Sequence, residues 1–143
     1  MYCGKLLIMF SNHFANSSIH KDSFKRTACD YVIRFHSEQN NLDDIVKNTY
    51  EFVKHLVYDY HKNDETVSGR LILKVNYHRV GKEKVVTYYH SSPHTEIINS
   101  AEDFYFTHML LICNRMDDFN RHGSNLLVKN VEEIHFHVNV LNK

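Results

Sequence analysis

The sequence has little glycine, little proline and no excess of charge of either sign. Its 143 residues include four glycines and one proline, and 17 Lys and Arg residues balance 17 Asp and Glu residues. Balanced charge argues against a polybasic protein that clamps duplex DNA and against an acidic, solvating protein. The sequence also lacks a P-loop, a Rossmann glycine run, an H-E-x-x-H motif and a G-x-S-x-G motif. We therefore expect a protein that is not an enzyme and that uses no cofactor.

Long apolar segments and paired cysteine motifs are missing as well. The apolar run from Leu6 to Phe10 is far shorter than the about 20 residues that span a bilayer, and it lacks the cleavage pattern of a secretory signal. Cys3, Cys29 and Cys113 are odd in number and widely spaced, which indicates reduced thiols rather than a disulfide framework. We expect an intracellular protein that has no membrane partner.

What is present is enough apolar surface for one core. Hydrophobic residues make up 43% of the chain and aromatic residues 13%, which suits a single folded domain rather than a disordered linker. We assign residues 27–143 to one α+β domain. Residues 1–26 are interpreted as an N-terminal extension, with a short strand at Lys5 to Phe10 and a polar loop from Asn12 to Ser23.

Two periodicities alternate along residues 27–143. Apolar residues recur at spacings of three and four over about 42–62 and again after Ser100, which predicts two amphipathic helices. A period of two predicts strands over about 31–35, 71–77, 85–89 and 134–140, the middle two joined as a hairpin. The order strand, helix, strand, strand, helix, strand predicts a ferredoxin-like βαββαβ fold, a four-stranded antiparallel sheet with two helices on one face.

The strand alternation also predicts which side chains meet the helices. The inward set is Tyr31, Ile33, Phe35, Leu71, Leu73, Val75, Ile134, Phe136 and Val138. The outward set is Arg34, His36, Lys74, Asn76, His78, His135 and His137. Tyr88 and His90 join the outward set if Val85, Thr87 and Tyr89 point inward, and a register slip of one residue inverts that assignment.

The outward face gathers cations, histidines and an aromatic ring, and this combination favours binding of single-stranded nucleic acid. Rings stack on bases and cations bind phosphates on sheets of this kind. We expect Arg34, Lys74 and Tyr88 to be the main contacts. His36, His78, His135 and His137 would add charge at lower pH.

Two other interpretations of this face stay open. The aromatic-rich RNP1 motif of RNA-recognition sheets is absent, so the face could be a polar surface exposed to solvent or one covered by residues 1–26. The sheet could also form a homodimer or dock to another protein, and zero net charge favours that alternative.

His135-Phe136-His137 is a His-hydrophobic-His triplet on the last predicted strand. Replication-initiator and relaxase nucleases bind a metal ion with such a triplet, because two rings on one strand face can share an ion that polarises a phosphate oxygen. Those enzymes also need a tyrosine on a later helix, and no tyrosine follows His137. Twelve histidines also produce such a triplet by chance. We therefore expect neither a nuclease nor a metal site.

The segment from Phe104 to Leu141 combines an amphipathic helix, the run G-S-N-L-L-V-K-N-V-E-E-I at residues 123–134, and an alternating strand. It resembles a region ahead of the catalytic domain in protein-primed family B DNA polymerases of Polinton or Maverick-type elements and related viruses. Their pattern is close to R-G-S-G-W-x-L-x-x-I-x-x-L. It is matched here by Gly123, Ser124, Val128, Val131 and Ile134 and not by Asn125 and Leu126. The resemblance implies a viral or mobile-element origin and work near DNA replication, without polymerase activity, since the catalytic carboxylates are not here. With this origin, we expect a location in the cytoplasm or nucleus of a host cell, and a docking partner would be another viral protein.

Overall fold

Both predicted helices are present in the structure, a computed structural model that describes residues 17–25, 27–35, 42–121 and 126–142. Helix α2 (Leu42–Lys62) has the predicted bounds, and Asp43 and Asp44 lie in its first turn, where carboxylates stabilise the positive end of the helix dipole. Helix α3 (Ala101–Arg121) is capped by Ser100, whose Oγ accepts a hydrogen bond of 3.3 Å from the backbone N–H of Asp103. Neither helix has an apolar stretch long enough to span a bilayer.

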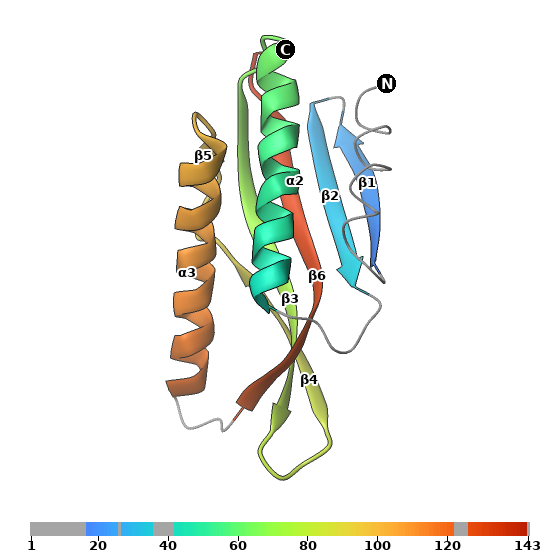
Figure 1. Ribbon diagram of the computed structural model, residues 1–143, viewed down its shortest axis with the longest axis vertical. Coiled ribbons are helices and arrows are strands. Elements are labelled where there is room, and N and C mark those ends of the chain that lie inside the picture. The colour runs from blue at the N-terminus through green and yellow to red at the C-terminus, as the bar shows by residue number, and fades with distance from the viewer. Residues whose placement is uncertain (1–16, 26, 36–41, 122–125, 143) are drawn as a thin grey trace.

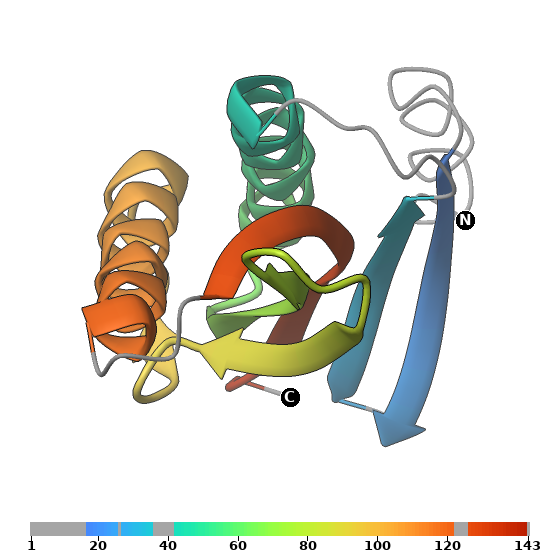
Figure 2. The same cartoon turned by 90° about the horizontal axis from the view of Figure 1, so that it is seen from below.

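In the described residues, six strands form one sheet from antiparallel pairs. They are β1 (Ser17–Lys25), β2 (Ala28–Phe35), β3 (Val67–Arg79), β4 (Val85–Ser91), β5 (Glu96–Ile97) and β6 (Leu126–Val140). Their order across the sheet is β1-β2-β6-β3-β4, and the short β5 pairs with β3. Both helices lie along the same side of this sheet (Figures 1 and 2).

The α+β class with two helices on one face of an antiparallel sheet is therefore as expected, but the four-stranded ferredoxin-like arrangement is not confirmed. The sheet contains two strands more than that arrangement, β1 and β5. Strand β6 lies between β2 and β3, and the hairpin strand β4 lies at the end of the path.

Two strand boundaries differ from the sequence interpretation. The polar stretch expected as a loop up to Ser23 includes most of β1, which pairs with β2 from Ser17 to Lys25. Backbone hydrogen bonds to an apolar neighbouring strand stabilise a strand whose own side chains are polar. The possible strand at 5–10 lies outside the described residues. Strand β6 also begins earlier than expected, at Leu126. Its first half was missed because register shifts opposite Lys74 and Asn76 break the alternation there.

The core lies between the helices and the inner face of the sheet. Its strand residues are those that alternation predicts: Tyr31, Ile33, Leu71, Leu73, Val75, Ile134, Phe136 and Val138 are buried, and Phe35 packs half-buried against them. From the helices come Phe52, Val53, Leu56, Phe104, Tyr105 and Ile112. The inward set is thus confirmed, and the residues between its members lie on the opposite face, which we call the open face.

Candidate functional site

The open face carries rows of side chains that run across β2, β6 and β3. Residues directly opposite each other in an antiparallel register lie on one face as close neighbours. Arg34, Glu133 and Lys74 form one such row. The next two rows are Val32, His135, Ile72 and Asp30, His137, Arg70. The structure therefore brings together four of the expected residues, namely Arg34, Lys74, His135 and His137.

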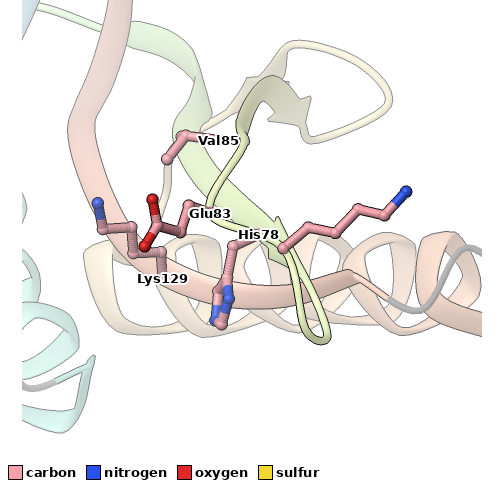
Figure 3. Close-up of a pocket in the computed structure, with 5 residues that line it drawn as sticks. His78, Glu83, Val85 and Lys129 are labelled. Carbon is pink, nitrogen blue, oxygen red and sulfur yellow. The ribbon is translucent and has the colours of Figure 1, made fainter.

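Two other expected residues, His36 and His78, are not part of these rows. His36 lies outside the described residues. His78 is on β3 at the far end of the sheet, where it lines a hollow of about 410 Å³ together with Lys82, Glu83, Val85 and Lys129. Figure 3 shows the labelled side chains of this hollow, which come from the β3–β4 hairpin and from β6.

The placement of Tyr88 on the open face is wrong. In the hairpin, Tyr88 is opposite Val75 and His90 is opposite Leu73, so both face the helices. The Tyr88 ring packs on Phe119 of α3 at a centroid distance of 4.4 Å. Strand β4 has the register in which even-numbered residues point inward, and one residue of slip reverses every side chain of a strand.

Tyr89 therefore occupies the position expected for Tyr88. Tyr89 is 60% exposed, and its ring centroid is 6.3 Å from that of His135. The Nζ of Lys74 lies 5.8 Å from the Tyr89 ring centroid. Lys74 also forms an ion pair of 3.0 Å with Glu132. The open face thus offers an exposed ring beside a cation, although the cation already has a carboxylate partner.

The centre of the open face is a network of carboxylates and imidazoles. The Nδ1 of His135 lies 3.0 Å from Oδ2 of Asp30, and its Nε2 lies 2.9 Å from Oε1 of Glu133. Arg34 Nε donates to Oε2 of Glu133 at 2.9 Å. The Nδ1 of His137 lies 3.3 Å from Oδ1 of Asp30. One arginine, two carboxylates and two histidines therefore form a continuous chain of contacts across β2 and β6.

These contacts shift the pKa values of the network. Burial lowers the pKa of His135, but hydrogen bonds with Asp30 and Glu133 outweigh it and raise the pKa above 6.5. Burial raises the pKa of Glu133, but hydrogen bonds with His135 and Arg34 outweigh it and lower that pKa. The pKa of His137 is lowered by burial, an effect that Asp30 opposes and Arg70 reinforces. The pKa values of the two histidines of the triplet are thus shifted in opposite directions.

In the part of the chain that the structure describes, Asp30, His135 and His137 also form a group that could hold a metal ion. Each offers one ligand atom, and the three atoms lie within 4.8 Å of one another. Beside them is a hollow of about 220 Å³, lined among others by His137, Arg70 and Asn139. The arrangement can therefore bind a cation through its side chains and leave space for a further ligand.

Asp30 is the site residue that the sequence interpretation missed. It lies two positions before Val32 and four before Arg34, so extending the alternation of that strand toward its start places it on the open face. Its partner His135 is 105 positions away, and that contact depends on β6 being the neighbour of β2. Alternation predicts the face of a side chain, but it does not predict the neighbouring strand.

Comparisons with known proteins add no constraint. No family model matches the chain, and no curated protein matches it. The function is therefore argued from the geometry of the open face.

Proposed function

We propose that the open face binds single-stranded nucleic acid, as a non-enzymatic binding module. The observation that carries this proposal is the exposed Tyr89 ring beside Lys74, on a face that no helix of the described chain covers. An exposed ring stacks on any base, and a neighbouring cation binds the phosphate that follows it. Tyr89 takes the role first expected for Tyr88.

Strand β3 extends this surface along one direction. Its alternation places Arg70, Lys74 and His78 on the open face, and His78 continues into the hollow with Lys82 and Lys129. A strand rises about 3.3 Å per residue, so the line from Arg70 to His78 is about 26 Å long. This length suits an extended strand of several nucleotides, with Tyr89 as the stacking platform and Arg34 at its side.

The resemblance of residues 104–141 to a region of protein-primed polymerases favours DNA as the ligand and replication of a virus or mobile element as the setting. Such work takes place inside the host cell. Strand β2, helix α2 and strand β3 form a βαβ unit split by β6, a unit that ferredoxin-like folds also contain.

The test is a fluorescence anisotropy titration with a labelled single-stranded oligonucleotide of about 12 nucleotides. Tyr89→Ala should weaken binding by about 5- to 100-fold, the loss of one stacked base, and Lys74→Gln should reduce the salt dependence. The matched control is Tyr58→Ala, because Tyr58 is 67% exposed on α2, away from the sheet. Equal losses in the Tyr58 and Tyr89 variants, or no binding at low salt, would contradict the proposal.

A second candidate function, a protein-interaction module, is favoured by the paired charges of the face. Arg34 is bound by Glu133 and Lys74 by Glu132, so part of the positive charge is already neutralised. Strand β4 is also an edge strand, and its residues Val85, Thr87 and Tyr89 are exposed. An exposed edge can pair with a second copy of the chain or with another viral protein. Sedimentation equilibrium that shows a monomer at all concentrations would contradict the homodimer.

A further inference from the structure

Three ligand-type side chains from two paired strands converge on one point of the open face. Asp30 of β2 is directly opposite His137 of β6, and His135 is two residues along on the same face. The distances to the carboxylate oxygens of Asp30 are 3.0 Å from Nδ1 of His135 and 3.3 Å from Nδ1 of His137. The first distance is to Oδ2 and the second to Oδ1, and one ligand atom from each of the three residues lies within 4.8 Å of the others. Metal bonds of about 2.1 Å at tetrahedral angles place neighbouring donors about 3.4 Å apart, so small side-chain movements would bring the three donors to one ion.

Asp30 supplies a second, independent observation. Its side chain is 7% exposed, and its Oδ1 is a buried atom that accepts no hydrogen bond from the described residues. The nearby Nδ1 of His137 is within ion-pair distance but not aligned as a hydrogen bond. A buried carboxylate oxygen without a donor lowers the stability of the fold, because its hydrogen bonds with water are lost and no hydrogen bond within the protein replaces them. A cation between Asp30 and the two rings would satisfy it.

The surroundings of His135 match those of a metal-binding histidine. A ligating imidazole usually donates its second ring N–H to a carboxylate, which fixes the tautomer and the ring orientation. Here Nε2 of His135 lies 2.9 Å from Oε1 of Glu133, and Arg34 holds the other oxygen of Glu133 at 2.9 Å. With Nε2 as the donor, Nδ1 of His135 presents a lone pair toward Asp30. Glu133 and Arg34 therefore act as positioning residues.

We propose that Asp30, His135 and His137 bind a divalent transition-metal ion of the zinc class. Two imidazoles and one carboxylate suit Zn²⁺, Mn²⁺ or Co²⁺, whereas Mg²⁺ and Ca²⁺ prefer oxygen ligands alone. Three protein ligands leave a coordination position open, and the hollow that His137 lines has room for a water molecule or an anion. Arg70 in that hollow favours an anion. This inference goes beyond the proposed function and departs from our expectation that the face holds no metal.

The test is calorimetric titration of the whole chain with Zn²⁺, without nucleic acid, so its outcome is independent of the proposed function. We expect one tight Zn²⁺ per chain and no comparable binding of Mg²⁺. Asp30→Asn and His137→Ala should each weaken Zn²⁺ binding more than tenfold, and Glu133→Gln should weaken it by about 10- to 100-fold. The matched control is His78→Ala, another histidine of the open face outside the cluster, which should bind Zn²⁺ as the unaltered protein does.

Thermal unfolding separates a metal site from an ion-pair network. Zn²⁺ should raise the Tm of the unaltered protein and of the His78 variant, but not that of Asp30→Asn or His137→Ala. If a variant does not fold, NMR of the unaltered protein replaces it, and Zn²⁺ should shift the imidazole resonances of His135 and His137 but not those of His78. Unchanged Zn²⁺ affinity in both variants, or shifts spread over all histidines, would overturn the proposal and leave His135 as a cation between Asp30 and Glu133.

Discussion

Gly69 of β3 lies directly against the backbone of His137 in β6. A Cβ at Gly69 would be 2.8 Å from the carbonyl oxygen of His137 and 3.0 Å from side-chain atoms of Ile98 and Phe136. Glycine is therefore required at this position by the close approach of the neighbouring strand, and the approach helps to fix the strand that carries both histidines of the triplet.

Gly69→Ala should destabilise the protein by about 1–3 kcal/mol, because the backbone of β6 must move to admit the methyl group. The measurement is urea-induced unfolding. The comparison variant is Gly81→Asn, since Gly81 has a φ of 79° and open space around it, and asparagine tolerates that conformation. We expect Gly81→Asn to change the free energy of unfolding by less than about 1 kcal/mol. A smaller effect at Gly69 than at Gly81 would contradict the packing described here.

Phe136→Ala should cost about 3–5 kcal/mol of stability. The Phe136 ring is 2% exposed and lies 5.8 Å from the ring of Phe104 and 6.4 Å from that of Tyr31. Leu110→Ala is the control, because Leu110 is 61% exposed on α3, and it should change stability by about 0.5 kcal/mol or less. Chemical denaturation of both variants checks the difference.

Replacing Tyr88 should lower stability more than replacing Tyr89 does, whereas replacing Tyr89 should weaken nucleic-acid binding more. Tyr88→Ala removes ring contacts with Phe119 and Tyr77 and should cost about 1–2 kcal/mol. Tyr89→Ala should leave stability within about 0.5 kcal/mol, since its ring is exposed. Thermal melts of the two variants test the register of β4, and a larger loss in the Tyr89 variant would mean that the opposite register is populated.

His90 should make the protein less stable at acid pH. Burial, reinforced by Arg115, lowers the pKa of His90 below 6.5, and burial raises the pKa of Tyr77 to about 12. The Tyr77 hydroxyl therefore keeps its proton, and it is hydrogen-bonded to Nε2 of neutral His90 across 2.8 Å. Because the unfolded chain takes up the proton first as the pH falls through 6.5, the folded state loses stability there, by at most about 1.4 kcal/mol per pH unit.

Denaturation of the unaltered protein and of His90→Gln at several pH values below 7 checks this sign. Glutamine can form a hydrogen bond with the Tyr77 hydroxyl without titrating, so the stability of the variant should fall less steeply as the medium is acidified. Tyr77→Phe keeps the buried imidazole and should retain the steep dependence. Parallel curves for the unaltered protein and His90→Gln would show that other groups account for the acid sensitivity.

Local patterns predicted the parts of the structure that local physics determines. The apolar stripe from 42 to 62 predicted α2 to its bounds, and alternation predicted the buried residues of three strands. The orientation of β4 was not predictable in this way, because the hairpin register depends on the conformation of its loop. The cluster of Asp30, His135 and His137 depends on β6 lying beside β2, a contact between distant segments that no periodicity encodes.

The position of β6 determines when the sheet can assemble. In the described part of the chain, β6 is the strand that hydrogen-bonds to both β2 and β3, so the β1–β2 and β3–β4 pairs stay unconnected until it enters between them. Contacts of such long sequence separation slow folding, since a large loop must close before they form. In a nascent chain that has emerged as far as α3, the edges of β2 and β3 that pair with β6 still lack that partner. The central strand of this sheet is therefore synthesised after the strands on either side of it.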